Sequence, residues 1–241
     1  MRNILVSGAN GGLGRAIARE FLEGDEKDHL WLGVHSRREQ AEQLASVFPG
    51  RVSVINLDVT EPGSWDSAIE AVLKENGNID VLVNNAGAHE DALVATMSDD
   101  AWQRVMELNL NGVFYGSRKA ARPMLSQRNG RIINIASLSA LSAPLGQANY
   151  ASAKAGVLVL TRVLAKELAR AGITVNAICP GYIETEAISR MDEAARKIAL
   201  GNVPMRRFGT PQEVSVAVRF LACSQASYIT GSVIKIDGGI Y

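Results

Sequence analysis

Residues 3–14 read N-I-L-V-S-G-A-N-G-G-L-G, and this stretch decides the fold class that we expect for the chain. Its apolar start predicts a short buried strand, and its end begins a helix that runs to about Glu23. Gly8, Gly12 and Gly14 lie between the two elements with the spacing G-x-x-x-G-x-G. Glycine permits a tight turn and lets a phosphate approach the N–H groups at the helix N-terminus, where the helix dipole favours anions. The stretch therefore predicts a phosphate-binding turn, with a plain strand-to-helix turn as the alternative.

Six further apolar runs predict buried strands at residues 29–34, 52–57, 79–83, 131–135, 174–179 and 232–236. Helical patterns separate these strands. After the first helix, the predicted helices are one that ends at about residue 48, one that runs to residue 75 with Thr60 as N-cap, and three over residues 101–124, 150–171 and 211–221. Strands that alternate with helices throughout are typical of a parallel sheet covered on both faces. We therefore expect a single Rossmann-type, doubly wound α/β domain over residues 1–241, with a seven-stranded parallel sheet flanked by helices.

Residues 185–209 interrupt this alternation, because they are mixed in charge and irregular in pattern. They lie between the sixth predicted strand and a helix that begins with the capping box Thr210-Pro211-Gln212-Glu213. A segment in that position is suited to cover a substrate, so we predict a substrate lid there.

The overall composition is balanced in charge. Lysine and arginine together number 25, as do aspartate and glutamate, so no net charge favours a nucleic acid or an anionic membrane as partner. No stretch approaches the ~18 apolar residues of a membrane span, and no leader pattern precedes the first strand, so we expect a soluble cytoplasmic protein. Cys179 and Cys223 lack the spacing of a metal site or a redox pair, and His29, His35 and His89 form no ligand group. No metal is therefore expected.

Residues 137–154, S-L-S-A-L-S-A-P-L-G-Q-A-N-Y-A-S-A-K, carry the candidate chemistry. Ser137 follows a predicted strand, and Tyr150 and Lys154 are four apart at the start of a helix, so their side chains share one face. An ammonium near a phenol favours the phenolate and lowers the phenol pKa from about 10. Tyr150 is therefore a candidate general acid, with Ser137 placed to hold a carbonyl oxygen. An interfacial tyrosine beside a solvated lysine is the alternative interpretation.

The end of the second predicted strand carries Ser36, Arg37 and Arg38, with no acidic residue before Glu39. In dinucleotide-binding units an acid at this place binds the free 2′-hydroxyl of the adenosine ribose, whereas basic residues accept a 2′-phosphate. We therefore predict NADP(H) over NAD(H), with Arg37 or Arg38 on the phosphate and Ser36 assisting. The alternative is that both arginines form the solvated first turn of the next helix. Asp58 ends the third strand, where it either accepts from the adenine amino group or serves the loop.

Further signals lie at the ends of later strands. The sequence N-N-A-G at residues 84–87 suits a backbone that passes close to a cofactor, and Asn84 is expected to stabilise the central strand. Asn109 lies within a helical stretch, where its amide competes for backbone hydrogen bonds, so it predicts a kink or a water site unless it is exposed and without a role. Ligands bind beyond the carboxyl ends of the strands in a doubly wound sheet. The glycine turn, residues 84–87, Ser137 and residues 180–185 therefore predict one shared crevice.

These residues together resemble the short-chain dehydrogenase/reductase family, and the resemblance covers the whole chain. It rests on the glycine turn, the N-N-A-G sequence, Asn109, the set Ser137, Tyr150-x-x-x-Lys154, and P-G-x-I-x-T at residues 180–185. Within the family, residues 130–155 and 207–241 are most similar to the 3-oxoacyl-[acyl-carrier-protein] reductases.

The resemblance implies NADPH-dependent reduction of a 3-oxoacyl thioester bound to acyl carrier protein, in fatty-acid, polyketide or aryl-polyene biosynthesis. Ser137 and Tyr150 then polarise the carbonyl and Tyr150 donates the proton, while Lys154 lowers the tyrosine pKa and Asn109 positions a water. The cofactor contacts that the resemblance implies involve Gly8, Asn10, Gly12, Leu13, Gly14, Ser36, Arg37, Arg38, Asp58, Val59, Asn85, Ala86, Gly87, Tyr150, Lys154, Pro180, Gly181, Ile183 and Thr185. It also implies a homotetramer, which the broad apolar surface of the 150–171 helix favours.

Three features depart from the reductase pattern. Gly11 stands where these reductases usually carry arginine, residues 88–91 read A-H-E-D in place of I-T-R-D, and Ala171 replaces a basic residue, although Arg170 adjoins it and Arg128 keeps the other basic position. A carrier protein is expected to meet Arg128, Arg170 and Arg206 or Arg207. Two alternatives stay open, a reductase or dehydrogenase of a free small ketone or alcohol, and a non-catalytic cofactor-binding subunit, a class that usually lacks the Tyr or Lys present here.

Overall fold

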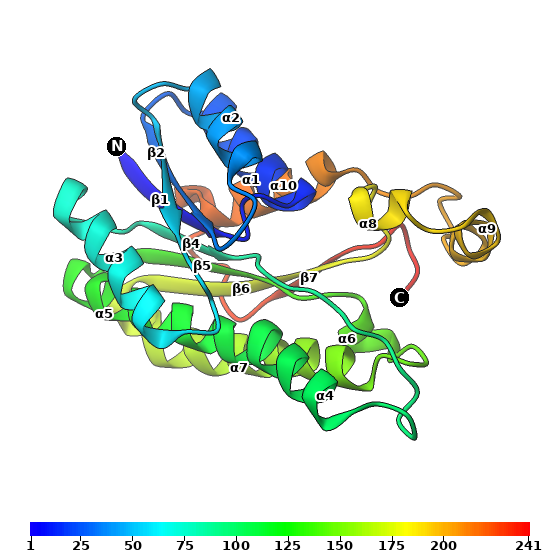
Figure 1. The fold of residues 1–241 in the computed structure, drawn as a ribbon. Coiled ribbons are helices and arrows are strands. Elements are labelled where there is room, and N and C mark those ends of the chain that lie inside the picture. The colour runs from blue at the N-terminus through cyan, green and yellow to red at the C-terminus, as the bar shows by residue number, and fades with distance from the viewer.

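The central feature of the computed structural model is a seven-stranded parallel sheet with the strand order β3-β2-β1-β4-β5-β6-β7 (Figure 1). The structure describes residues 1–241, apart from the side chains of Asn76 and Ala187. The strands are β1 (Arg2–Ser7), β2 (Asp28–Val34), β3 (Val52–Asn56), β4 (Val81–Asn84), β5 (Gly130–Ile135), β6 (Ile173–Pro180) and β7 (Val233–Ile236). The predicted Rossmann-type α/β fold is confirmed.

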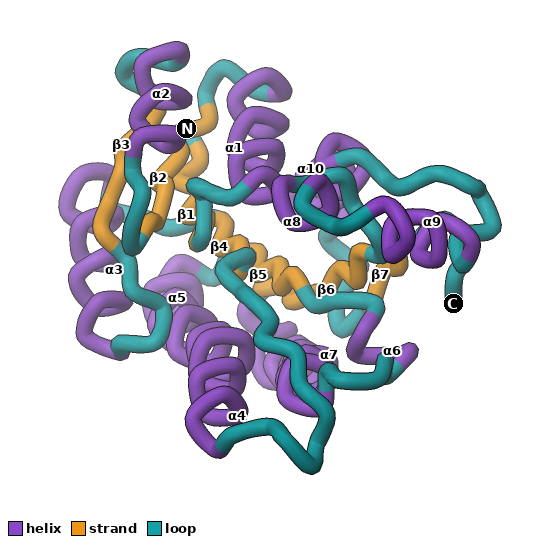
Figure 2. Tube along the Cα trace, turned by 45° about the vertical axis from the view of Figure 1, so that its right-hand side comes forward, coloured by secondary structure: helices purple, strands orange, loops and turns teal.

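Helices cover both faces of this sheet, as the two views in Figures 1 and 2 show. Ile17, Phe21 and Val218 pack against one face and Trp65, Met124 and Leu168 against the other, and all six are buried. One face is covered by α1 (Gly12–Gly24), α2 (Glu39–Val47) and α10 (Pro211–Ala222), and the other by α3 (Pro62–Asn76), α4 (Asp99–Met106), α5 (Gly112–Gln127) and α7 (Ala148–Leu168). Burial of apolar side chains on both faces is what makes the strands continuous hydrophobic runs.

The sheet places the candidate site through its topology. Strand β1 pairs with β2 on one side and with β4 on the other, so the chain reverses its direction of travel across the sheet at β1. A crevice opens beyond the carboxyl ends of the strands at such a switch point. The glycine turn after β1 and residues 84–87 after β4 both lie there.

The predicted 101–124 helix is not continuous. It consists of α4, a π-helical turn η1 (Glu107–Asn111) and α5, and the π-helical turn contains Asn109. The prediction of a local irregularity at Asn109 is confirmed, and the alternative of an exposed residue is wrong, because Asn109 is fully buried. A π-turn of this kind commonly marks a functional position.

Two other expectations were wrong in detail. Thr60 is not an N-cap, because helix α3 begins at Pro62 with Glu61 before it and the Thr60 hydroxyl donates to Asp58 Oδ1 at 2.7 Å. The segment 185–209 is not irregular throughout, since it contains α8 (Glu186–Ser189) and α9 (Glu193–Gly201), which lie beyond the carboxyl ends of the strands (Figure 1). Short helices remain: α6 (Ser139–Ser142), η2 (Ala169–Ala171) and η3 (Ser224–Ala226).

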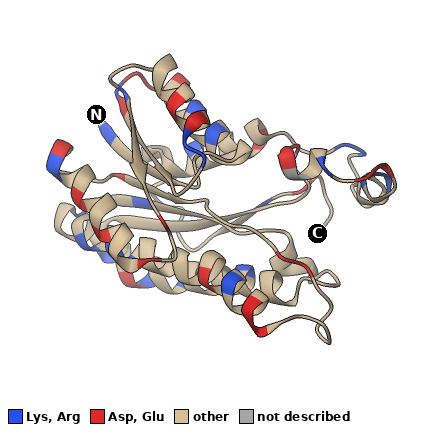
Figure 3. Ribbon diagram, viewed as in Figure 1, with Lys and Arg blue, Asp and Glu red and all other residues tan. Residues whose placement is uncertain are grey.

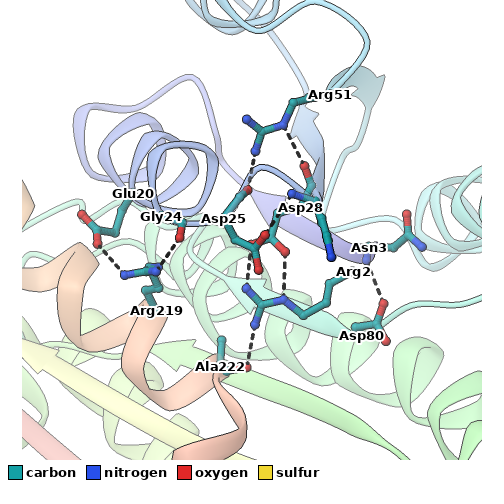
Figure 4. Close-up of polar contacts among 11 residues, drawn as sticks. Arg2, Asn3, Glu20, Gly24, Asp25, Asp28, Arg51, Asp80, Arg219 and Ala222 are labelled. Atoms are coloured by element: carbon teal, nitrogen blue, oxygen red, sulfur yellow. Dashed lines mark hydrogen bonds and ion pairs between the residues drawn. The ribbon is translucent and has the colours of Figure 1, made fainter.

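Ion pairs tie the amino ends of the strands together (Figure 4). Arg2 at the start of β1 donates to both carboxylate oxygens of Asp28 at the start of β2, at 2.8 and 2.6 Å. Arg219 of α10 donates to the Gly24 carbonyl oxygen at 2.8 Å and so joins α10 to the end of α1. The Asp28 side chain is fully buried, and a bidentate arginine–carboxylate pair is among the stronger polar contacts in proteins. This edge is therefore held by charged contacts, opposite the edge that carries the crevice.

Basic and acidic residues are interspersed along the helices on both sides of the sheet (Figure 3). In the described part of the chain, no helix combines the length and the apolar character needed to cross a membrane.

Candidate active site

A cavity of about 760 Å³ lies at the carboxyl ends of the strands, and most of the predicted site residues line it. Its walls are the glycine turn, the loop after β4, the start of α7 and the segment that leads into α8. The predicted residues that line it are Gly8, Asn10, Gly12, Leu13, Gly14, Ser36, Arg37, Asn85, Ala86, Gly87, Ser137, Tyr150, Lys154, Pro180, Gly181, Ile183 and Thr185. Four predicted residues do not line it, namely Arg38, Asp58, Val59 and Asn109.

The glycine turn is shaped by close backbone packing. Gly8 has φ 64°, and a Cβ there would lie 2.8 Å from the Ala86 Cα. A Cβ on Gly14 would lie 2.4 Å from the Gly8 carbonyl oxygen, so no side chain fits at either position. Asn85 Nδ2 donates to the carbonyl oxygens of Ser7 at 2.9 Å and Gly8 at 3.1 Å, which fixes the β4 loop onto the turn. The packing explains why small residues occupy both loops.

The turn also leaves an anion site at the start of α1. The N-cap residue Gly11 has no side chain, and no side-chain hydrogen bond caps the first N–H groups of this helix. These donors, together with the helix dipole, face the cavity and suit the diphosphate of a dinucleotide. The residues present therefore fit such a cofactor.

The two arginines after β2 have different surroundings. Arg37 has φ 52° and lines the cavity, next to Ser36, whose carbonyl oxygen accepts from Asn10 Nδ2 at 3.1 Å. Arg38 instead donates to the Val54 carbonyl oxygen at 3.2 Å and pairs with Glu42 Oε1 at 3.3 Å. Of the two predicted phosphate ligands, only Arg37 is thus placed at the cavity.

Asp58 is engaged within its own loop. Its Oδ1 accepts from the Thr60 N–H at 3.0 Å and from the Thr60 hydroxyl, while Oδ2 lies 3.6 Å from His35 Nδ1. Burial alone would raise the pKa of Asp58, but the two hydrogen bonds from Thr60 outweigh it and lower the pKa. Of the two roles predicted for Asp58, the loop role is the one these contacts serve.

Tyr150 and Ser137 face each other in the cavity. Burial raises the pKa of the Tyr150 phenol above 10, and the Ser137 hydroxyl beside it acts in the opposite direction. In the chain by itself the net effect on this pKa is thus a rise, and the lowering by Lys154 stays a prediction. Desolvation of the phenolate is the larger effect. The raised pKa keeps Tyr150 protonated at neutral pH, which is the form that a general acid needs.

Lys154 is buried next to this tyrosine. Its Nζ donates to the Ile135 carbonyl oxygen at 2.9 Å and lies 5.7 Å from the centroid of the Tyr150 ring. Burial lowers the pKa of Lys154 from 10.5 to about 8, because the ammonium has lost most of its hydration. The ammonium is therefore still mostly protonated at neutral pH, but it titrates much closer to neutrality than an exposed lysine does.

Asn109 contacts the site from beneath. Its Nδ2 donates to the carbonyl oxygens of Ala88 at 2.7 Å and Val105 at 2.9 Å. Among the side chains that the structure describes, its Oδ1 is buried without a hydrogen-bond partner. A Cβ on Gly87 would lie 2.7 Å from this Oδ1 and 3.2 Å from Lys154 Nζ, so both atoms face the same point. An unpaired acceptor and an ammonium that share a space are suited to hold a water between them.

Buried amides support the strands under the site. Asn84 Nδ2 donates to Asn134 Oδ1 at 2.8 Å and to the Ser117 hydroxyl at 3.0 Å, and Asn134 Nδ2 donates to Thr161 Oγ1 at 2.9 Å. This network joins β4, β5, α5 and α7, and the prediction that Asn84 stabilises the central strand is confirmed.

Two polar residues at the cavity were missed as site residues. His89 lies beside Tyr150, with 5.9 Å between the ring centroids. Glu186 pairs with Arg15 at 2.6 Å and covers Gly12, where a Cβ would lie 2.7 Å from Glu186 Oε2. His89 could have been found from its place two residues after N-N-A-G, whereas the Glu186 contact spans 171 residues and leaves no local signal. No set of three His, Cys, Asp or Glu in the described residues is arranged to hold a metal ion.

A doubly wound parallel sheet, a glycine turn and a buried Ser-Tyr-Lys group at one crevice define a dinucleotide-dependent oxidoreductase site. The chain belongs to the short-chain dehydrogenase/reductase family. The family model described as Enoyl-(Acyl carrier protein) reductase matches residues 8–241. The chain is 41% identical to the 3-oxoacyl-[acyl-carrier-protein] reductase FabG of Thermotoga maritima, over 98% of this chain and 96% of that protein. It is 39% identical to FabG of Vibrio cholerae and 40% identical to FabG of Escherichia coli K12, over the same shares.

Proposed function

We propose that the chain is an NADPH-dependent reductase of 3-oxoacyl thioesters carried by acyl carrier protein, in a biosynthesis of the fatty-acid type. The observation that carries this proposal is the pairing of the Ser137 and Tyr150 hydroxyls at the cavity, above the buried Lys154. The relatives named 3-oxoacyl-[acyl-carrier-protein] reductase, which match nearly the whole chain, support the choice of substrate.

Different cavity residues bind different parts of the cofactor. The N–H groups of the glycine turn bind the diphosphate, Arg37 binds the 2′-phosphate, and Ile183 and Thr185 orient the carboxamide. NADPH supplies a hydride when it is bound at this site. Arg38 and Asp58 act through the loop, because their hydrogen bonds go to Val54 and Thr60.

The catalytic residues act on the oxygen of the substrate carbonyl. Ser137 and Tyr150 donate hydrogen bonds to this oxygen, and they stabilise the negative charge that develops on it. Tyr150 then gives up its proton. Lys154 stabilises the transient phenolate and passes a proton to it, and Lys154 regains a proton through the water that Asn109 Oδ1 holds.

The family-model description names an enoyl reductase, whereas the relatives at 39–41% identity are named as 3-oxoacyl reductases. A panel of four substrates separates these activities: a 3-oxoacyl and a 2-enoyl chain on the same carrier protein, a 3-oxoacyl coenzyme A thioester, and a free cyclic ketone. We expect NADPH oxidation to be fastest with the 3-oxoacyl carrier protein and absent with the enoyl chain. Faster turnover of the free ketone would favour a small-carbonyl reductase, and tight NADPH binding without turnover of any of the four would favour a cofactor-binding subunit.

Arg37 is expected to determine the preference for NADPH. Replacing Arg37 by Ala removes a charge-assisted contact to the 2′-phosphate, so the Kd for NADPH should rise about 10- to 100-fold while the Kd for NADH stays within about threefold. The measurement is a titration of each cofactor by fluorescence. Arg38→Ala is the matched control and should change the Kd for NADPH by less than about threefold. Equal effects of the two substitutions would assign the phosphate to both arginines.

We further propose that residues 185–209 form the substrate lid. Figure 1 shows α8 and α9 beyond the carboxyl ends of the strands, and Glu186 and Ile188 of α8 line the cavity. Arg196 of α9 pairs with Glu184, which directly precedes the segment. The Arg15–Glu186 pair joins this segment to the helix of the glycine turn. A lid with these two ion pairs can respond to the cofactor beneath it.

We also propose that the chain forms a homotetramer. Acyl carrier protein is the proposed partner that delivers the substrate. Val159 and Val163 of α7, together with Phe114 and Leu125 of α5, form an exposed apolar face that suits a subunit interface.

The docking role predicted for Arg128 and Arg170 needs this second subunit. Arg128 Nη2 donates to the Arg170 carbonyl oxygen at 3.2 Å, and both residues precede the amino ends of β5 and β6, at the edge opposite the crevice. Within one chain they therefore lie at the end of the sheet away from that chain's own cavity.

A further inference from the structure

Residues 88–92, which follow the N-N-A-G sequence, are held in place from several sides. Asn109 binds this segment from beneath, and residues just before Tyr150 bind it from the side. The hydrogen bonds run from Asn109 Nδ2 to the Ala88 carbonyl oxygen (2.7 Å), from Asn149 Nδ2 to the Glu90 carbonyl oxygen (3.0 Å), from Gln147 Nε2 to Asp91 Oδ2 (3.0 Å) and from the Ala92 N–H to the Gly146 carbonyl oxygen (2.9 Å). The segment is therefore positioned by the same elements that carry the catalytic residues.

His89 is the side chain that this segment presents to the cavity. Its ring stands edge-on to the Tyr150 ring at 63°, it lines the cavity, and 54% of its side chain is exposed. His89 Nδ1 lies 3.0 Å from Asp91 Oδ1. Because an ionised carboxylate only accepts hydrogen bonds, Nδ1 carries the hydrogen and Nε2 remains the free nitrogen. In the neutral ring this Nε2 is an acceptor.

The cavity has an apolar part at Tyr182 and Ile188, which line it beside the charged Glu186 and Arg190 and pack on a cluster around Val203 and Phe208. His89 also lines the cavity, and its ring is backed by the Asp91 carboxylate. A ketone carbon carries two substituents, so an alkyl chain suits the Tyr182 and Ile188 part and a polar substituent suits His89.

We propose that His89 determines substrate specificity by accepting, at Nε2, a hydrogen bond from the amide N–H of the pantetheine arm nearest the thioester sulfur. This inference rests on the proposed function, since it needs a thioester substrate. Both acyl carrier protein and coenzyme A present the same arm, so His89 recognises the chemistry that they share. Asp91 is a positioning residue, because it fixes which ring nitrogen is free, and Gln147 fixes Asp91 in turn.

The test compares two small 3-oxobutanoyl thioesters, the N-acetylcysteamine thioester with the amide and the ethyl thioester without it. His89→Phe keeps the aromatic contact with Tyr150 and removes the acceptor. We expect kcat/KM for the N-acetylcysteamine thioester to fall about tenfold, mainly through KM, and kcat/KM for the ethyl thioester to stay within about twofold. Asp91→Asn should produce a smaller loss confined to the same substrate.

Turnover of the ethyl thioester tests the proposed function separately, because this substrate lacks the group that His89 is inferred to bind. An equal loss with both thioesters would mean that His89 acts by shaping Tyr150, and it would overturn the inference. The inference is also overturned if the wild-type chain reduces the ethyl thioester but His89→Phe leaves its preference for the amide thioester unchanged.

Discussion

Tyr150→Phe is expected to lower kcat for a 3-oxoacyl thioester by about 10³-fold, the range observed for loss of a positioned general acid. The substitution removes one hydroxyl and leaves the ring, so the packing against His89 and the fold are retained. The Kd for NADPH should change by less than about tenfold. Turnover is measured by NADPH absorbance and binding by fluorescence.

A second tyrosine serves as the control for the loss of a phenol hydroxyl. Tyr228 is fully exposed and lies outside the cavity, so Tyr228→Phe should leave kcat unchanged. A Tyr150→Phe variant that keeps more than a tenth of the wild-type kcat would show that Ser137 or a water supplies the proton. The proposed role of Tyr150 would then be abandoned.

Lys154→Met is expected to abolish most of the activity and to change how stability depends on pH. The unfolded chain has a lysine pKa near 10.5, and the folded chain has a value of about 8. Between these two values the unfolded chain binds more protons, so this lysine makes the free energy of unfolding rise with pH. Below pH 8 the folded chain bears the full cost of the buried ammonium, roughly 3 kcal/mol.

Urea unfolding from pH 7 to pH 10 measures this effect as a difference between variants. Relative to Lys154→Met, the wild-type chain should gain up to about 1.4 kcal/mol per pH unit above pH 8. Turnover should meanwhile fall about 10³-fold in the variant, and wild-type turnover should decline above pH 8 as the ammonium is lost. Lys166→Met replaces an exposed lysine of the same helix and serves as control. Parallel pH curves for wild type and Lys154→Met would contradict the lowered pKa.

Elements with strong local signals could be predicted from the sequence. The seven strands were predicted to within two residues at almost every end, because buried parallel strands are short apolar runs with clear punctuation. The capping box at Thr210 forms as expected, with its hydroxyl accepting from the Glu213 N–H and the Glu213 side chain accepting in return. The prediction of Thr60 as N-cap was wrong because Pro62 is the first helical residue, so the helix begins later than a threonine alone indicates.

Properties that depend on packing could not be predicted. The spacing of Tyr150 and Lys154 indicates that they share a face, but only burial decides that the phenol pKa rises and the ammonium pKa falls. Arg37 and Arg38 were equivalent candidates in the sequence, and the contacts of Arg38 with Val54 and Glu42 distinguish the two. Helix α9 had a usable signal in Asp192, whose side chain accepts from the Ala195 N–H at 2.7 Å, whereas α8 is too short to leave a periodic pattern.

The charged contacts of Arg2, Asp28 and Arg219 hold the amino edge of the sheet, and the cavity residues all lie at the other edge. Evolution can therefore alter the loops that select a substrate while leaving these anchoring contacts untouched. Residues 88–91 and residues 185–209, the proposed lid, can diverge among descendants of one ancestral chain, since a change there affects substrate recognition more than it affects the fold. Because the contacts that hold the sheet lie apart from the residues of the cavity, the fold tolerates changes in substrate specificity.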